Sequence, residues 1–436
     1  MPGTLDKPRA FVDSPAPGTT DPLTPRQRLD RHPNPRKTRR VSTGPLSDLR
    51  VLEITHNLAG PLTAMHLADL GAEVIKIERP AGDEWREHEG VKGHPGRSRH
   101  FLQVNRNKRA ACIDLSTAEG HEIAGRLVER TDVLITNLRV GVHDRLGVDW
   151  ERCERLNPGL VYCQLTAFGG SGPLAGRRGY DMVVEARAGF LVDGLRPGDP
   201  PRSSPVPIND TALPLLAGLS ILAALRERDR SGLGQRIDLS LLQSAVALNA
   251  HSLVRLDDGQ ESEVRFSRAF YRTYATQDGW IAVAAYAEHL ARAFCATLGL
   301  STLLDDPRFQ TRASRVRNEE LLAELFAETI VTRTTSDWEA AFASQGVPAG
   351  PVHQRDALFD DPQVRAMGML SEFHDDELGQ ITMTSPVTGL SRTPGTIRVA
   401  GRHLGADTRD VLAEIGYSEA EINDLESRGV AVSRSG

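Results

Sequence analysis

The stretch LRVLEITHNLAGPLTAMHLADLGAEVIKIE (residues 49–78) decides the fold. Residues 49–55 form a short apolar run typical of a buried strand, and residues 74–78 form a second one. Between them, residues 63–70 carry a helical pattern that Gly71 closes. A strand, a short helix and a second strand in this order predict a right-handed βαβ unit with parallel strands.

The same alternation continues along the chain. Strands fit residues 111–114, 132–137 and 160–166, while helices fit residues 119–130 and 150–156. This pattern predicts an α/β fold, in which a Rossmann-like, doubly wound parallel sheet forms a large domain. Ligands are then expected at the carboxyl ends of the strands.

A glycine-rich stretch, GGSGPLAG (residues 169–176), follows the last of these strands. It contains Pro173, and no helix follows at the required place, so the fingerprint of a dinucleotide-binding loop is not met. We interpret the stretch as a turn-rich loop at a strand end, and it does not imply NAD.

The bulk composition sets the class of protein. A chain of 436 residues is too long for one ordinary core, so two domains are expected. Its 39% hydrophobic and 25% charged residues are typical of a soluble globular protein, and no membrane span is expected. The net charge of −6 argues against nucleic acid as a partner. The four cysteines show neither CxxC pairs nor zinc-ligand spacing, so we expect buried thiols in a cytoplasmic protein, without a disulfide framework or a metal.

The domain plan follows from composition and pattern. Residues 1–44 predict a disordered, basic, Pro-rich tail without the apolar core of a secretory signal. Residues 45–240 then form the first part of the large α/β domain, residues 241–350 a linker and a smaller α+β domain, and residues 351–436 a return to the large domain. Inside the small domain, Asp278-Gly279 predicts a β-hairpin.

One carboxylate stands out in VPINDTALPLLAGLSILAAL (residues 206–225). Asp210 ends an apolar approach to a long helical run, and Pro214 fits only a first helical turn. Asp210 is therefore either a helix N-cap or a catalytic group. The two interpretations are compatible, because backbone N–H groups at a helix start hold a carboxylate ionised and aimed. A fixed, ionised carboxylate beside a pocket suits covalent catalysis of acyl transfer.

Taken together, these stretches resemble the class III CoA-transferase family, the carnitine/formyl-CoA transferase (CaiB/BaiF-like) type. The resemblance covers residues 45 to 430, roughly, and several long motifs occur in the right order. They include LAGPLTAMHLADLGAEVIKIERPAGD (58–83), VNRNKRAACIDL (104–115), TDVLITN (131–137), RLGVDWERCERLNPGLVYCQLTAFGGSGPLAGRRGYD (145–181), PVPIND (205–210), GLGQRIDLSLLQSAVAL (232–248) and LGADTRDVLAEIGYSEAEI (404–422).

The resemblance implies an activity for Asp210, which matches the family's catalytic carboxylate. That carboxylate attacks the thioester of an acyl-CoA to give a mixed anhydride. The released CoA thiolate then forms an aspartyl-CoA thioester, or attacks later, after the acceptor acid has exchanged in. A second anhydride, formed with the acceptor acid, delivers the new acyl group to CoA. CoA is thus a substrate carrier, with no permanently bound cofactor and no metal. The partners are an acyl-CoA, a small carboxylic acid and a second copy in an interlocked homodimer, without nucleic acid or membrane.

The resemblance also implies a set of CoA contacts. Arginines suit the phosphates and apolar walls suit the adenine. Arg145 as a solvated residue and Ile113 as a core residue are the alternatives. The basic run at residues 105–109 is either a polar loop or, in our preferred interpretation, a loop guarding the anionic cofactor. The implied contacts are Arg79, Ile113, Asn137, Leu138 (where the family has Phe), Arg145 and Arg178.

Two positions depart from related patterns. Leu58 stands where the transferases often have Gln or a similar residue, which predicts an acyl pocket that is drier or differently shaped. Tyr180-Asp181 stands where the related α-methylacyl-CoA racemases have His-Asp. Two-base racemisation needs a group that titrates near neutral pH, so Tyr180 favours a transferase, and we expect Asp181 to be a core hydrogen-bonding residue. A racemase or epimerase and a non-catalytic CoA-binding protein remain the alternatives.

Overall fold

The computed structural model describes residues 44–192, 198–256 and 266–434. The predicted tail, apart from Gly44, and the polar stretch 257–265 lie outside the described residues. The chain divides into two compact units, one made of Met1–Leu253 with Ser371–Gly436 and the other of Val254–Leu370. These boundaries lie at 253/254 and 370/371, rather than at the predicted 240/241 and 350/351.

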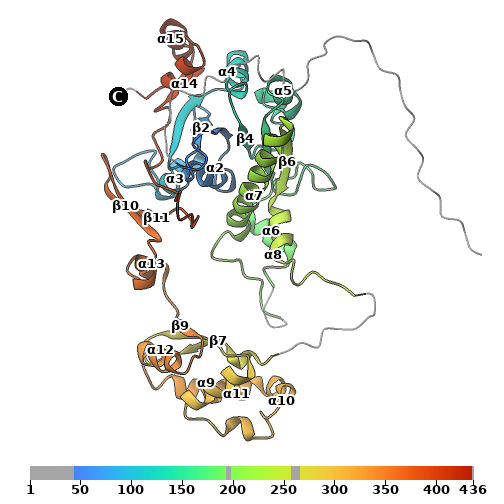
Figure 1. Ribbon diagram of the computed structural model, residues 1–436, viewed down its shortest axis with the longest axis vertical. Helices are drawn as coiled ribbons and strands as arrows, with labels where there is room; N and C mark the ends of the chain where they lie inside the picture. The colour runs from blue at the N-terminus through green and yellow to red at the C-terminus, as the bar shows by residue number, and fades with distance from the viewer. Residues whose placement is uncertain (1–43, 193–197, 257–265, 435–436) are drawn as a thin grey trace, which may run out of the picture. The chain divides into compact units, whose positions relative to one another are not determined.

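A seven-stranded sheet, with strand order β12-β3-β2-β1-β4-β5-β6, organises the first unit (Figure 1). All neighbouring strands are parallel except β12, which is antiparallel to β3. The predicted α/β fold with a doubly wound sheet is confirmed. The strand order reverses between β1 and β4, which is where such folds open a crevice for ligands. The strands are β1 (Arg50–Ile54), β2 (Glu73–Glu78), β3 (Lys108–Ile113), β4 (Val133–Thr136), β5 (Val161–Thr166), β6 (Gln235–Ser240) and β12 (Ala431–Val432).

Helices cover both faces of this sheet, because its strands bury side chains on both sides. Val51 of β1 belongs to the core under α2, α6, α7 and α8, whereas the next residue, Leu52, belongs to the core under α4, α5, α14 and α15. The helices of this unit are α2 (Ala59–Asp69), α3 (Arg99–Val104), α4 (Ala118–Val128), α5 (Trp150–Leu156), α6 (Asp181–Ala188), α7 (Ile208–Ser231), α8 (Leu241–Leu248), α14 (Thr408–Glu414) and α15 (Glu419–Ser427). The strands β10 (Leu370–Asp375) and β11 (Gly379–Thr384) form a separate ribbon.

Helix α7 is the longest helix of the first unit among the described residues. Its core face carries Leu213, Ala217 and Ile221, while Leu215 and Leu219 are exposed on the opposite side. Within the described ranges it is the one helix long and apolar enough to cross a membrane by length and composition. Because α7 packs against α2, α8 and β6, we interpret it as a core helix, a kind that passes the same test.

The second unit is a small α+β domain. Its antiparallel sheet joins β7 (Tyr271–Ala275), β8 (Trp280–Ala284) and β9 (Ala349–Pro351), so the hairpin predicted at Asp278-Gly279 is confirmed. A core of aromatic rings, including stacked Phe294 and Phe342, lies among the helices. Those helices are α9 (Glu288–Thr297), α10 (Arg312–Arg317), α11 (Glu319–Ile330), α12 (Thr335–Ser344) and α13 (Pro362–Ala366).

Candidate active site

Asp210 lies in the first turn of α7, as its third residue. The helix N-cap is Pro207, which has no side-chain cap, so the interpretation of Asp210 as the N-cap is wrong. The cap comes from α6 instead. The Asp181 carboxylate oxygen Oδ1 accepts hydrogen bonds from the backbone N–H groups of Asn209, at 2.7 Å, and Asp210, at 2.9 Å. Asp181 is therefore a buried hydrogen-bonding residue, as expected, and it satisfies donors that a helix start leaves free.

Two influences disfavour the ionised form of Asp210, which the N–H groups of a helix start would favour. Burial, followed by the negative charge of Asp181, raises the pKa of Asp210 to about 7. Burial and a hydrogen bond to Asp181 likewise raise the pKa of Glu185, one turn further along α6. The sequence suggested an ionised carboxylate, but the structure shows one that changes protonation state near neutral pH. Carboxyl groups with shifted pKa values are common at catalytic sites.

The side chain of Asn209, at the start of α7, lacks a hydrogen-bond partner in the described part of the chain. Asn209 is fully buried, and neither of its side-chain amide atoms has a hydrogen-bond partner among the described residues. Pro214 is the seventh residue of α7, so the prediction that it lies in a first turn is wrong. Because proline has no N–H, it cannot donate the helical hydrogen bond to the carbonyl of Asp210. The carbonyl of Asp210 thus lacks its helical N–H donor, and the side-chain amide of Asn209 lacks a partner within the described ranges.

The start of α7 lies toward the carboxyl edge of the sheet. Helix α7 leads into β6, which is parallel to β5, so the helix runs back from the carboxyl edge. Predicted CoA contacts follow strands at the same edge, with Arg79 after β2, Asn137 after β4 and Arg178 after β5. The topology therefore brings these residues to the side of the sheet on which Asp210 lies.

Asn137 ties two strand ends together at the point where the strand order reverses. Its Oδ1 accepts a hydrogen bond from the backbone N of His56, at 3.0 Å, and its Nδ2 donates to the His56 carbonyl, at 2.7 Å. Leu138 packs partly against the core under α4. The two residues thus shape the crevice between β1 and β4.

The predicted basic contacts are exposed. The Arg79 side chain is 64% exposed and lies 3.6 Å from Glu84, itself exposed. Arg145 and Arg178 are also exposed, and neither has a carboxylate partner in the described part of the chain. Their guanidinium groups are therefore available to phosphates. Ile113 differs, because its side chain is 1% exposed within the core, so the core alternative is correct and the predicted contact through that side chain is wrong.

In the basic run at residues 105–109, the first four residues are buried and Arg109 is half-buried, and the run is not aimed at a ligand. Arg106 pairs with Asp69 at 2.6 Å, and Lys108 pairs with Glu53 at 2.7 Å. Lys108 also donates to the carbonyl of Pro61, at 2.8 Å, in the first turn of α2. The preferred interpretation of a loop guarding the cofactor is therefore wrong. These side chains fasten α2 to the sheet.

The two positions that depart from related patterns, Leu58 and Tyr180, both lie at the starts of helices. Leu58 is the N-cap residue of α2 and offers no side-chain hydrogen bond. Tyr180 is the N-cap residue of α6 and is 70% exposed. It directly precedes Asp181, so the position where racemases have their histidine lies next to the group that caps α7.

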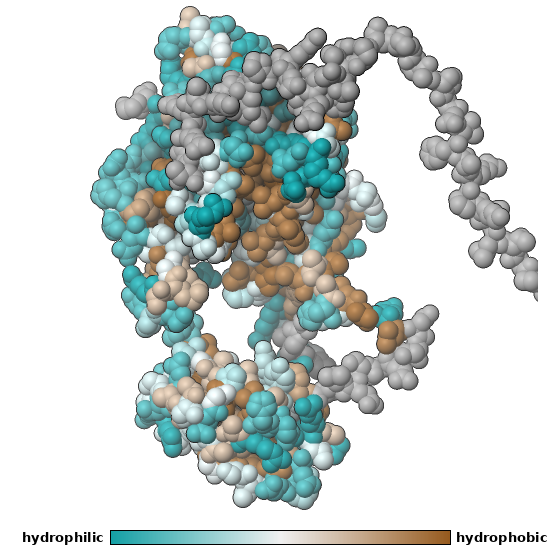
Figure 2. All heavy atoms as spheres, in the orientation of Figure 1, coloured by the Kyte–Doolittle hydropathy of each residue, from teal (hydrophilic) through white to brown (hydrophobic). Residues whose placement is uncertain are grey.

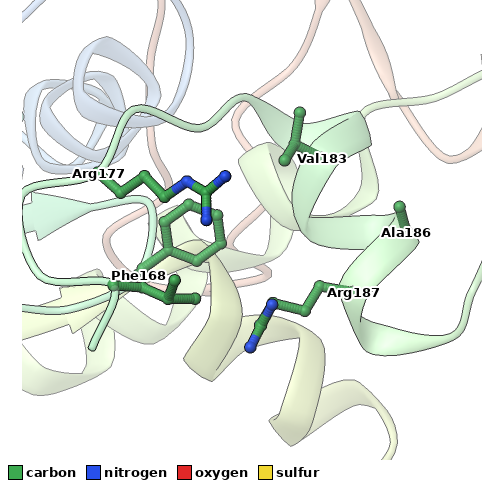
Figure 3. A pocket seen from close by; sticks show the side chains of 6 residues that line it. Phe168, Arg177, Val183, Ala186 and Arg187 are labelled. Carbon is green, nitrogen blue, oxygen red and sulfur yellow. The ribbon is translucent and has the colours of Figure 1, made fainter. Parts of the chain in front are cut away.

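A cavity of about 300 Å³ opens between the glycine-rich loop and α6 (Figure 3). Figure 3 shows the guanidinium groups of Arg177 and Arg187 on either side of the Phe168 ring. Neither arginine has a carboxylate partner among the described residues. This mixture of apolar wall and free guanidinium suits an anion. Sequence reasoning missed the cavity because it did not predict α6. The lining residues are Phe168, Leu174, Arg177, Val183, Ala186 and Arg187.

One group of possible metal ligands occurs in the described ranges. His88, Glu89 and His100 each offer a ligand atom within 4.8 Å of the others. His88 and Glu89 are exposed, and the rings of His88 and His100 stack at 5.3 Å, beside Trp85. Ring stacking accounts for this proximity without an ion, so the group does not define a metal centre.

These features, an open α/β sheet with a half-buried carboxylate at a helix start and exposed arginines at the carboxyl edge, are typical of an α/β enzyme that binds anionic ligands. The model of CoA-transferase family III matches residues 46–408, and the chain belongs to that family. The predicted family and its enzymatic nature are thereby confirmed.

Similar proteins share nearly the whole chain. The mouse succinyl-CoA:glutarate CoA-transferase is 33% identical over 89% of this chain and 91% of its own length. The succinyl-CoA–D-citramalate CoA-transferase of Chloroflexus aurantiacus is 33% identical over 88% of this chain and 98% of its own length. Among solved structures, a CAIB/BAIF family protein from Brucella suis superposes with a TM-score of 0.77, at 32% identity, over 86% of this chain and all of its own.

Proposed function

We propose that the protein transfers CoA from an acyl-CoA to a dicarboxylic acid, with the Asp210 carboxylate as nucleophile. The observation that carries the proposal is the place of Asp210, held in the first turn of α7 by two hydrogen bonds to Asp181 at the carboxyl edge of the sheet. Family membership supplies CoA transfer itself. The dicarboxylic acceptor is supported by the names of relatives that act on glutarate and citramalate.

The reaction consists of four balanced acyl transfers. Asp210 attacks the thioester carbonyl of the donor, the C–S bond breaks, and CoA thiolate leaves a mixed anhydride. The thiolate attacks the aspartyl carbonyl, which releases the donor acid as its carboxylate and forms an aspartyl-CoA thioester. The acceptor carboxylate then displaces CoA thiolate to form a second anhydride. Attack of the thiolate on its acyl carbonyl yields the new acyl-CoA and restores Asp210.

The raised pKa of Asp210 fits this role. Only the ionised carboxylate is a nucleophile, and a carboxylate of higher basicity is the stronger nucleophile of its kind. A pKa of about 7 keeps a large fraction ionised at neutral pH while raising that basicity. No step requires a metal or a histidine base.

We also propose where CoA lies. Arg79, Arg145 and Arg178 would hold its phosphates, and Asn137 with Leu138 would line the path toward Asp210. The exposure of the three arginines, and the absence of carboxylate partners for Arg145 and Arg178 within the described residues, support this placement. Guanidinium groups bind phosphates through paired hydrogen bonds.

A homodimer in the cytoplasm completes the proposal. The side chains of Leu215, Leu219 and Leu222 are 57%, 68% and 40% exposed along one side of α7. Figure 2 shows apolar side chains gathered over the region of this helix. Contiguous apolar surface of this kind marks an interaction site, and a second copy would cover it. The four buried, free cysteines support a reducing compartment. Light scattering of the purified chain measures the assembly, and a monomer at micromolar concentration would contradict the dimer.

Trapping tests the covalent step. With succinyl-CoA as donor, hydroxylamine should convert Asp210 to a hydroxamate that peptide mass spectrometry locates, and Asp210→Asn should show none. Glutarate and D-citramalate are the first acceptors to test, with propionate as the monocarboxylic control. Label on no aspartate would favour the racemase or the non-catalytic binder. Exchange of the α-proton in deuterated water separates those two, because only a racemase catalyses it.

A further inference from the structure

Two buried carboxyl groups of α6 lie beside the first turn of α7. Asp181 accepts the backbone hydrogen bonds of Asn209 and Asp210, and Glu185 accepts one from the backbone N of Ser204, at 3.1 Å. The side chains of Asp181 and Glu185 are 6% and 2% exposed. In the part of the chain that the structure describes, no cation pairs with either of them or with Asp210. The chain thus places three carboxyl groups together without a neutralising partner.

Carboxyl groups placed together without a cation favour states that carry fewer negative charges. Burial, followed by a hydrogen bond to Asp181, raises the pKa of Glu185 and so favours its protonated form. Two carboxylates within hydrogen-bond distance share one proton and one negative charge rather than carry two charges. The negative charge of Asp181 raises the pKa of Asp210, whose backbone N–H donates to Asp181 at 2.9 Å.

We propose that Asp181 is a positioning residue for the Asp210 nucleophile. Its two hydrogen bonds to backbone N–H groups fix the first turn of α7, and its negative charge sets the pH at which Asp210 ionises. Glu185 holds a proton, so the pair of Asp181 and Glu185 carries one negative charge. This inference rests on the proposed role of Asp210. It adds to that role a buried acid pair, Asp181 and Glu185, that sets the pH range in which the Asp210 nucleophile is ionised.

The other elements packed on α7 bring no competing charge to its start. Helix α8 has no ionisable side chain. The ionisable residues of α2, His66 and Asp69, lie in its last turn, away from the carboxyl edge. Strand β6 holds Arg236 and Asp238, which pair with each other at 2.9 Å, and β5 contributes only a phenol and a thiol. Among the described residues, Asp181 is accordingly the charged group that, after burial, raises the pKa of Asp210.

The decisive variant is Asp181→Asn in the full-length protein. Asparagine keeps an acceptor oxygen for both backbone N–H groups but removes the charge. The acidic limb of the kcat–pH profile, expected near pH 7 in the wild type, should move to lower pH by about half a unit or more. Asp181→Ser, which also offers a neutral acceptor, serves if Asp181→Asn does not fold. The exposed Asp229→Asn, near the other end of α7, is the matched control and should leave the limb in place.

The Glu185→Gln variant tests whether Glu185 holds a proton. A neutral glutamine donates to Asp181 as a protonated Glu185 does, so the acidic limb should stay within about 0.2 units of the wild-type position. A fall of the limb in Glu185→Gln as large as in Asp181→Asn would show that Glu185 is ionised and would overturn the proposal. So would an unmoved limb in active Asp181→Asn. Retained transfer in Asp210→Asn would instead remove the proposed function, so the two failures are distinguishable.

Discussion

Lys76 and Glu53 stand directly opposite each other on β2 and β1, and their side chains form an ion pair of 3.0 Å inside the molecule. The two side chains are 1% and 0% exposed. Lys108 approaches the same carboxylate from β3, at 2.7 Å. Three neighbouring strands are therefore joined by charge as well as by backbone hydrogen bonds. Burial lowers the pKa of Lys108 to about 8, while Glu53 and its neighbouring acids overcome burial and raise that of Lys76 to about 12.

Replacing Lys76 by methionine should destabilise the fold strongly. The change leaves the buried carboxylate of Glu53 with one cation instead of two, and breaking a buried pair costs about 3–5 kcal/mol. Urea unfolding of both proteins measures the difference. The surface pair Arg126–Glu122 is the matched comparison, and Arg126→Ala should cost below about 0.5 kcal/mol. Equal effects of the two changes would show that the buried network does not stabilise the sheet.

Asp210→Asn should abolish CoA transfer while preserving the fold. An amide cannot form the mixed anhydride, so kcat should fall by about 10³-fold or more. A coupled assay with succinyl-CoA and glutarate measures the loss, and circular dichroism checks the fold. Transfer at more than about a tenth of the wild-type rate would contradict the assignment of the nucleophile.

The same substitution should also stabilise the protein, in a pH-dependent way. Burial and Asp181 raise the pKa of Asp210 to about 7 in the folded state, above the unfolded value of 3.8. The folded state thus binds the proton more tightly, so stability falls as the pH rises from 3.8 toward 7. Thermal melts should show Asp210→Asn above the wild type at pH 8, with a smaller difference at pH 5. A constant difference would contradict the raised pKa.

Arg145→Ala and Arg178→Ala should weaken CoA binding rather than chemistry. Each removes a guanidinium group that has no internal partner among the described residues, so the fold should tolerate the change. The KM for acyl-CoA should rise by about tenfold at low salt, with kcat reduced less than about threefold. The reason is that contacts to the phosphates stabilise the bound substrate and the transition state equally. Steady-state kinetics with both substrates varied gives the answer. A raised KM for the acid instead would place these residues elsewhere.

Apolar periodicity predicted most of the central sheet because its strands are buried on both faces and read as continuous apolar runs. Helix α5 has its predicted bounds, and α6 was missed because its buried face carries Asp181 and Glu185. The cap on α7 was also invisible, since its acceptor lies 29 residues away from Asp210. The charges of residues 105–109 look solvated in sequence, and only the opposing acids of β1 and α2 reveal them as internal.

The large unit closes only through the last residues of the chain. Strand β12 pairs with β3, and Asp407 and Thr408 accept hydrogen bonds from the backbone N–H groups of Ala110 and Cys112, at 2.8 and 2.9 Å. During synthesis on the ribosome, the edge of β3 therefore stays unpaired until about three hundred further residues have emerged. A premature stop codon anywhere in the final helices would leave that edge open and direct the product toward aggregation.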